Sequence, residues 1–156
     1  MRILVTGHKG YIGSVMVPML LGAGHDVVGL DSDLFRQCTF GPGMHDVPEQ
    51  RLDLRDTQIR QLEGFDAIVH LGALSNDPLT DLNPDITYDI NHVASVRLAQ
   101  LAKEAGVARF LYSSSCSSYG QAGDALVDET ADLHPITAYA ISKARVEQDV
   151  AKLAEG

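Results

Sequence analysis

The stretch that decides the fold is Ile3-Leu4-Val5-Thr6-Gly7-His8-Lys9-Gly10-Tyr11-Ile12-Gly13. A short apolar run is followed by three glycines at three-residue intervals, and then by apolar residues at helical spacing. The first glycine permits a tight turn, the second lets the backbone approach a diphosphate, and the third lets helix and strand pack closely. This pattern predicts a strand, a loop and a helix whose N-terminus binds the phosphates of a dinucleotide. A plain glycine turn is the alternative.

A carboxylate at the end of the next apolar run supports the dinucleotide interpretation. Residues 27–30 are predicted to form the second strand, and Asp31 follows it directly. At a strand end a carboxylate accepts hydrogen bonds from ribose hydroxyls and repels a 2′-phosphate, so NAD is predicted in preference to NADP. The alternative is an aspartate that only closes a turn. Lys9 either adds positive charge to the phosphate loop or is simply solvated.

Short apolar runs alternate with helical patterns along the whole chain. Strands are predicted at residues 3–5, 27–30, 51–53, 67–71 and 109–112, and helices at 12–20, 56–62, 85–105 and 137–153. Residues 72–84 are predicted to form a loop. Strands that alternate with crossover helices indicate an α/β fold, in which helices cover both faces of a parallel sheet.

Composition excludes several classes of function. The 156 residues carry 12 basic and 21 acidic side chains, a formal net charge of −9, which disfavours a nucleic-acid partner. Hydrophobic residues make up 45%, and no apolar run approaches the roughly 18 residues of a membrane span. The chain opens on a strand instead of a signal peptide, and Cys38 and Cys116 lack metal-ligand spacing. We therefore expect a cytoplasmic protein with no membrane contact and no metal site.

A tyrosine and a lysine four residues apart are the candidate chemical groups. Tyr139 and Lys143 fall in the predicted helix 137–153, where side chains at i and i+4 share a face. A nearby ammonium stabilises a phenolate, which is then a usable base for a sugar or alcohol hydroxyl. Such a pair also occurs by chance. It gains weight from the serine-rich run 113–118, which follows a predicted strand at the sheet edge where ligands bind in such folds.

In combination, these motifs resemble the extended short-chain dehydrogenase/reductase family, in its branch of NAD-dependent nucleotide-sugar epimerases and dehydratases. The matching residues, in family order over essentially the whole chain, are Thr6 to Gly13, Asp31, Asp53, His70 to Ala73, Asn91, Ser113 to Gly120, Tyr139 and Lys143. The resemblance implies a Rossmann-type doubly wound parallel sheet of about five strands in the order 3-2-1-4-5. It also implies that residues 1–156 form an NAD-binding domain.

The resemblance also implies the roles of individual residues. Ser115 would be the catalytic hydroxyl, Tyr139 the base, and Lys143 the ribose-binding partner of that base. The residues implied in cofactor binding are Gly7, Gly10, Tyr11, Ile12, Gly13, Asp31, Asp53, Leu54, Leu71, Gly72, Ala73, Asn91, Ser113, Tyr139 and Lys143. The alternative for Asp53 is a turn or helix cap, and the alternative for His70 is a structural role. Cys116 is either a reactive thiol or a small packed residue.

Two departures from the family bear on function. Sequences that perform dehydration resemble Thr-Asp-Glu where this chain has Ser115-Cys116-Ser117, so a 4,6-dehydratase is disfavoured and an epimerase or dehydrogenase acting on a nucleotide-sugar is expected. Family chains are about twice as long, so we expect residues 1–156 to lack the substrate domain that follows the Tyr-Lys helix in the family. The alternative is therefore a truncated NAD-binding module without sugar turnover. The resemblance further implies a homodimer formed through the helices near 85–105 and 137–153. The rival interface is the open edge of the last predicted strand, since such an edge can pair with another chain.

Overall fold

The computed structural model describes residues 1–38, 46–120 and 126–154. By its internal contacts the chain divides into two compact units. The first contains residues 1–72 and 98–113, and the second contains residues 73–97 and 114–156.

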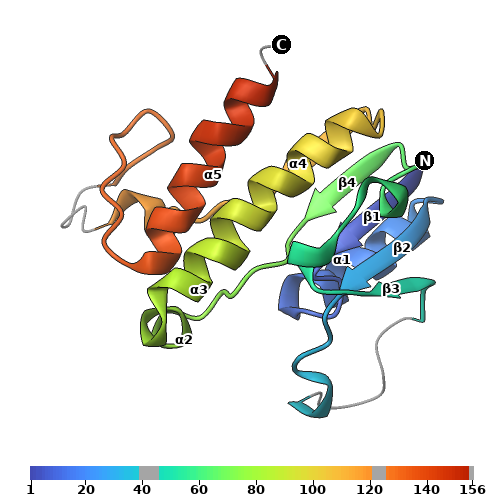
Figure 1. The fold of residues 1–156 in the computed structure, drawn as a ribbon, viewed down its shortest axis with the longest axis horizontal. Helices are drawn as coiled ribbons and strands as arrows, with labels where there is room; N and C mark the ends of the chain where they lie inside the picture. Colours follow the sequence, from blue (N-terminus) through green and yellow to red (C-terminus); the bar gives the residue numbers. More distant parts are fainter. Residues whose placement is uncertain (39–45, 121–125, 155–156) are drawn as a thin grey trace. The chain divides into compact units, whose positions relative to one another are not determined.

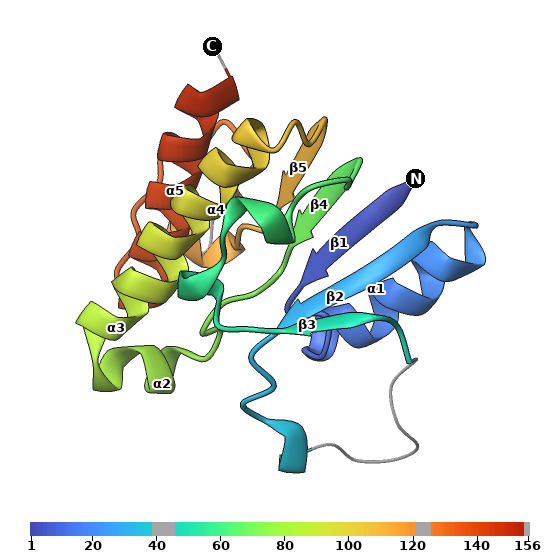
Figure 2. The ribbon, with the colours of Figure 1, turned by 45° about the vertical axis from the view of Figure 1, so that its right-hand side comes forward.

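The first unit contains a parallel sheet of five strands (Figures 1 and 2). The strands are β1 (Arg2–Thr6), β2 (Asp26–Asp31), β3 (Glu49–Arg51), β4 (Ala67–His70) and β5 (Arg109–Tyr112). Their order in the sheet is β3-β2-β1-β4-β5, which confirms the predicted order. In register, Val5 lies beside Gly29 of β2 and Val69 of β4, so the carboxyl ends of these strands lie at one edge.

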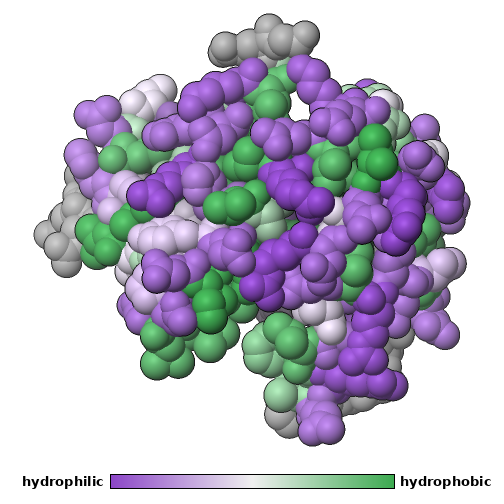
Figure 3. All heavy atoms as spheres, in the orientation of Figure 1, coloured by the Kyte–Doolittle hydropathy of each residue, from purple (hydrophilic) through white to green (hydrophobic). Residues whose placement is uncertain are grey.

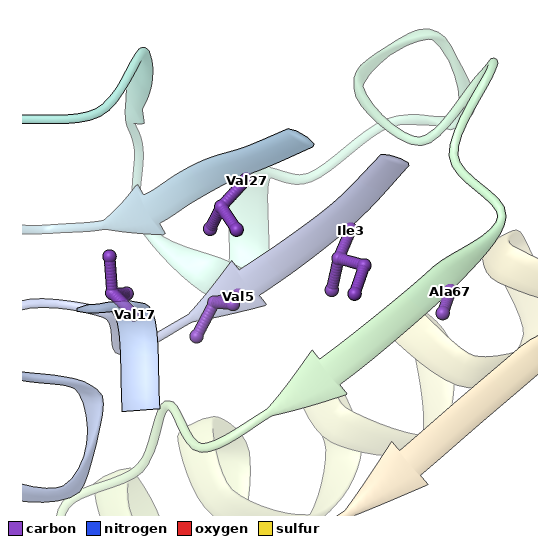
Figure 4. Close-up of a cluster of buried hydrophobic side chains, with 5 residues drawn as sticks. All are labelled: Ile3, Val5, Val17, Val27 and Ala67. Atoms are coloured by element: carbon purple, nitrogen blue, oxygen red, sulfur yellow. The ribbon is translucent and has the colours of Figure 1, made fainter. Parts of the chain in front are cut away.

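Side chains of both parities are buried on the central strands, as expected for a parallel sheet covered on both faces. On one face Ile3, Val5, Val27 and Ala67 pack against Val17 of helix α1 (Tyr11–Gly22), as Figure 4 shows. The opposite parity carries Leu4 and Ile68, both completely buried. Helix α4 (Ala94–Glu104) contributes the buried Leu98 and Ala102 to this unit.

Two local predictions in the first unit are wrong. The third strand begins and ends two residues earlier than predicted, at Glu49–Arg51, because residues 49–51 pair with β2. The helix expected at 56–62 is replaced by two 3₁₀ turns, η2 (Leu54–Asp56) and η3 (Ile59–Gln61). Asp53, not Asp56, caps the first of them, since its carboxylate accepts from Arg55 N–H at 2.9 Å. A further 3₁₀ turn, η1, spans Arg36–Cys38.

The second unit is helical. It contains α2 (Asp77–Leu82), α3 (Pro84–Tyr88), a π-helical turn η4 (Asp89–Val93), the start of α4, the 3₁₀ turn η5 (Cys116–Tyr119) and α5 (Ala138–Ala154). The loop predicted at 72–84 therefore contains a helix. Asn76 and Asn83 cap α2 and α3 by accepting from the N–H groups of residues three positions later, and a proline opens each first turn. These Asn and Pro signals, read together, would have predicted both helices.

One group of exposed apolar side chains lies on the second unit, over α2 and α3. Figure 3 shows hydrophobic residues gathered over α2 and α3, where Leu79, Leu82 and Ile86 are exposed. Within the described residues, none of the helices has the length and apolarity that a bilayer crossing needs.

Candidate functional site: a dinucleotide loop and a Tyr-Lys pair

The phosphate loop is shaped by a close approach of two backbones. Gly7 adopts φ +69°, a conformation that glycine takes without strain. A Cβ at this position would lie 2.7 Å from Gly72 N and 2.8 Å from Gly72 Cα. Gly7 N–H also donates to Leu30 O at 2.8 Å, so the turn is tied to β2 as well. The first glycine of the motif is therefore required by both conformation and space.

The other two glycines bring the helix start against this turn. Gly10 is the N-cap of α1, and its N–H donates to Gly7 O at 3.0 Å. A Cβ on Gly13 would lie 2.6 Å from Gly7 O and would collide with His8 O. No described side chain caps the first turn of α1, where Tyr11 and Ile12 lie exposed. The first N–H groups of α1 lack intrahelical partners, which is the arrangement that binds a diphosphate.

Asp31 lies at the end of β2 beside this loop. Its Oδ2 accepts from Lys9 N–H at 3.1 Å, and its Oδ1 accepts from Asp33 N–H at 2.8 Å. Each oxygen therefore has one backbone donor and keeps a lone pair for a further hydrogen bond. The structure thus orients the carboxylate predicted to bind the adenosine ribose.

Sequence reasoning assigned no role to His8 or Glu49, and it predicted that Lys9 either adds charge to the phosphate loop or is solvated. His8 is buried, with Nε2 3.2 Å from Glu49 Oε2, and a Cβ on Gly29 would collide with its ring. Lys9 Nζ lies 2.7 Å from Glu49 Oε2 and 3.0 Å from Asp33 Oδ2. The ammonium is therefore paired with two carboxylates and is not held among the loop amides. Ion pairs between residues this far apart in the chain leave no periodic signal in a sequence.

The carboxylate of Asp53 is hydrogen-bonded to Arg55, two residues later in the chain. Besides the N–H of Arg55, its carboxylate accepts from Arg55 Nε at 3.0 Å and Nη2 at 2.9 Å. The side-chain hydrogen bonds from Arg55 lower the pKa of Asp53. Leu54, which follows, is buried. A contact of Asp53 or Leu54 with the adenine stays a prediction.

The turn after β4 is held by a buried polar group. Thr6 Oγ1 lies 2.6 Å from His70 Nδ1 and accepts from Gly72 N–H at 3.1 Å. Leu71 N–H donates to Thr6 O at 3.1 Å. His70 is 1% exposed, with its ring 5.8 Å from that of Phe110 between centroids. Of the two interpretations of His70, the structure favours the structural one, in which it orients Thr6 and the turn at Leu71 and Gly72.

Asn91 belongs to the second unit and lies in the π-helical turn η4. Its Oδ1 accepts from Leu74 N–H and its Nδ2 donates to Leu74 O, both at 2.8 Å. The buried carboxamide of Asn91 therefore makes the two backbone hydrogen bonds that a neighbouring strand would make with Leu74. It holds the segment that begins at Ala73 in place. Direct contact of Asn91 or Ala73 with the cofactor stays a prediction.

Tyr139 and Lys143 share one face of α5, as the four-residue spacing predicts. Lys143 Nζ lies 5.6 Å from the centroid of the Tyr139 ring. Lys143 is buried, and this desolvation lowers its pKa to about 8, although the charge of Glu147 opposes the shift. The lysine is therefore mostly protonated at pH 7, with its charge largely removed from water.

The serine-rich run 113–118 is divided between the two units: Ser113 belongs to the first, and residues 114–118 belong to the second. Ser113 continues β5, since its N–H donates to His70 O at 3.2 Å. In the second unit, Ser115 caps η5 by accepting from Ser117 N–H at 3.2 Å, and η5 contacts α5. Ser114 Oγ donates to Glu147, one helical turn after Lys143. Sequence reasoning missed Glu147, although its position four residues after Lys143 on α5 is a usable signal.

Comparison with known proteins identifies the lineage. A family model described as the NAD dependent epimerase/dehydratase family matches residues 3–156. The chain belongs to this family. The resemblance drawn from the motifs is thereby confirmed, and so is NAD as the cofactor, since the family is NAD-dependent and solved structures similar to this chain contain NAD.

Individual relatives cover the chain almost completely. A UDP-glucose 4-epimerase of Neisseria meningitidis serogroup C is 33% identical in an alignment 159 residues long, which covers 94% of this chain and 46% of that protein. The Thermus thermophilus UDP-glucose 4-epimerase in complex with NAD matches with a TM-score of 0.88 and 28% identity, over 99% of this chain and 51% of its own. DesIV, a dTDP-glucose 4,6-dehydratase of Streptomyces venezuelae with NAD and TYD bound, gives a TM-score of 0.88 and 32% identity, over 99% and 52%. The chain thus spans about half the length of these relatives.

The first unit has the features that NAD binding requires. A Cβ at position 7 or 13 would collide with neighbouring backbone atoms and disturb the loop, the first turn of α1 presents backbone N–H groups, and Asp31 is oriented by two backbone donors. These residues would hold the diphosphate and the adenosine ribose. A contact of Leu71 or Gly72 with the cofactor stays a prediction.

The crowding at Gly7 predicts a specific loss of stability. Gly24→Ala should cost about 1 kcal/mol, because Gly24 also has a positive φ but has nothing within 4 Å of a Cβ. Gly7→Ala carries the same penalty and in addition overpacks against Gly72, which should add about 1–3 kcal/mol. Urea unfolding monitored by circular dichroism measures both free energies. Equal losses for the two variants would show that the contact with Gly72 does not constrain position 7.

The burial of Lys143 predicts its titration. In the folded chain Lys143 should titrate near pH 8, and Glu147→Gln should lower the pKa of Lys143 further, because it removes the charge that favours the ammonium. NMR of carbon-13 dimethylated lysines measures this pKa. Glu104→Gln, an exposed glutamate on α4, is the control and should leave the Lys143 titration unchanged. An unchanged titration in Glu147→Gln would remove Glu147 from the environment of the ammonium.

Proposed function

We propose that this chain is the cofactor-binding part of an NAD-dependent enzyme that epimerises or oxidises a nucleotide-sugar. The observation that carries the proposal is the pair on α5, in which a buried, charged Lys143 lies beside the ring of Tyr139. Membership of the family and the glycine loop of the first unit support it.

Each residue has a distinct proposed role. NAD, when bound, would supply the oxidising group for one carbon of the sugar. Tyr139 would exchange a proton with the sugar hydroxyl, and the Lys143 ammonium would stabilise the charge left on the phenolic oxygen. Ser115 would donate a hydrogen bond to the reacting oxygen, which requires its hydroxyl hydrogen; its oxygen already accepts from Ser117 N–H.

A 4,6-dehydration is not proposed. Elimination of water needs an acid and a base, and the run 113–120 contains neither Asp nor Glu. Its Cys116 is exposed and its Ser117 is half-buried. The similarity to DesIV therefore supports the common fold and cofactor more than the same reaction.

Substitution of the phenol tests the proposal. With NAD⁺ and UDP-glucose, Tyr139→Phe should lower any conversion of the sugar by about 100-fold or more, since it removes the proton-transfer group. NAD⁺ affinity, measured by calorimetry, should stay unchanged. Tyr88→Phe is the matched control, because Tyr88 packs under Arg145 in the same unit and should retain the rate. An unchanged rate in Tyr139→Phe would contradict the role of Tyr139, and NAD⁺ binding without turnover by the wild type would favour the binding-module alternative.

We also propose that the chain forms a homodimer through the helices of its second unit. Val93 on η4 is 55% exposed, and Ile90, Ile141 and Val150 are half-buried, which leaves apolar surface for a partner. Ala94 and Ala144 are buried within the chain, so they do not extend this surface. The rival interface is the outer edge of β5, the last strand of the sheet, where Leu111 is exposed.

A charge at position 93 distinguishes the two interfaces. Val93→Glu should convert the dimer to a monomer, because the charge would be buried without a partner. Size-exclusion chromatography with light scattering measures the mass. Val15→Glu is the control, since Val15 on α1 is similarly exposed and lies outside the proposed surface. A dimer that persists in Val93→Glu would favour the β5 edge, and a monomeric wild type would contradict both interfaces.

A further inference from the structure

The ammonium of Lys9 lies between two carboxylates. Its Nζ is 3.0 Å from Asp33 Oδ2 and 2.7 Å from Glu49 Oε2. The side chain of Lys9 is 22% exposed, that of Asp33 only 7% and that of Glu49 37%, so Asp33 is the more buried of the two partners. Hydrogen bonds to Glu49 and Asp33 raise the pKa of Lys9, which keeps it charged. The lysine of the phosphate loop is thus protonated, and its positive charge is balanced by two carboxylates.

The ion pairs of Lys9 with Asp33 and Glu49, called the Lys9 bridge below, lie next to Asp31, the carboxylate that is predicted to bind the ribose. The N–H of Lys9 donates to one oxygen of Asp31, and the N–H of Asp33 donates to the other. Asp33 adopts φ +58°, a left-handed conformation that aspartate tolerates better than most residues. Hydrogen bonds therefore link Lys9, Asp31 and Asp33 to one another beside the end of β2.

Other charged groups lie near the Lys9 bridge, but Lys9 remains the main partner of Asp33. His8 Nε2 lies 3.2 Å from the same Glu49 oxygen that Lys9 contacts. Arg36 and Arg51 act electrostatically on Asp33, but the hydrogen bond from Lys9 is the largest influence that lowers the pKa of Asp33. A 2′-phosphate on a ribose held by Asp31 would be repelled by that carboxylate, and the ammonium of Lys9 is already engaged by two others.

We propose that Asp33 and Glu49 are specificity-determining residues, which exclude a 2′-phosphorylated dinucleotide by holding the Lys9 ammonium away from it. Selectivity for NAD over NADP then depends on this bridge as well as on the charge of Asp31. The proposal rests on the cofactor role of the phosphate loop. It makes Lys9 a cation that becomes available to phosphate when its two partners lose their charge.

Isosteric substitutions test this selectivity in the full chain. Calorimetric titration gives the Kd of NAD⁺ and of NADP⁺ for the wild type, Asp33→Asn, Glu49→Gln and the double variant. Asn keeps the size of Asp33 and tolerates its φ. The ratio of the NADP⁺ Kd to the NAD⁺ Kd should fall by about tenfold or more in the double variant, the effect of one new charge-assisted contact. Each single variant should change it in the same direction by a smaller factor.

Two further variants separate the bridge from general electrostatics. Asp26→Asn combined with Glu63→Gln removes two exposed acidic charges outside the Lys9 bridge and should leave the ratio unchanged. Lys9→Met added to the double variant should abolish the gain in NADP⁺ binding. The proposal is overturned if the ratio stays constant in the double variant, or if the gain survives Lys9→Met. Absence of NAD⁺ binding by the wild type would overturn the cofactor role and this proposal together, whereas NAD⁺ binding with a constant ratio overturns this proposal alone.

Discussion

The contact between the backbones of Gly7 and Gly72 is the constraint on which the rest of the first unit depends. It joins the turn after β1 to the turn after β4, at the edge where the parallel strands end. Because unpaired N–H groups at the start of a helix can bind a diphosphate, the packing of two glycines sets the position of the candidate diphosphate site. Thr6 reinforces this edge, since it bonds both His70 and Gly72. These groups are ordered before any ligand arrives, and such preorganisation reduces the entropy lost on binding.

In the second unit, too, hydrogen bonds hold the candidate chemical groups and their neighbours in place. Asn91 supplies both hydrogen bonds that Leu74 would find in a sheet, and the π-helical turn around Asn91 is the local cost of that arrangement. Ser114 is tied to Glu147 on α5, so the segment after β5 is attached to the helix that carries Tyr139 and Lys143. A buried lysine with a pKa of about 8 is maintained because a carboxylate on the same helix partly offsets its desolvation.

The sequence by itself determined the features that repeat at short range. Glycine spacing in residues 7–13 predicted the phosphate loop, apolar runs predicted five strands, and the motifs together indicated the family. The i and i+4 positions of Tyr139 and Lys143 predicted that they share a helix face. Each of these follows from local geometry, since a strand repeats every two residues, a helix every 3.6, and a tight turn demands glycine.

Only the tertiary structure decided the rest, because it depends on residues brought together from distant parts of the chain. The pairing of β3 with β2 moved that strand to Glu49–Arg51, and it also placed Glu49 against Lys9 and His8. His70 had two possible roles until Thr6 was found beside it. Lys9 stood in a phosphate loop, where an ammonium is expected to serve the ligand, yet two carboxylates from β3 and the end of β2 neutralise it. Charge pairing across strands has no period along the sequence, so it is visible only once the strands are side by side.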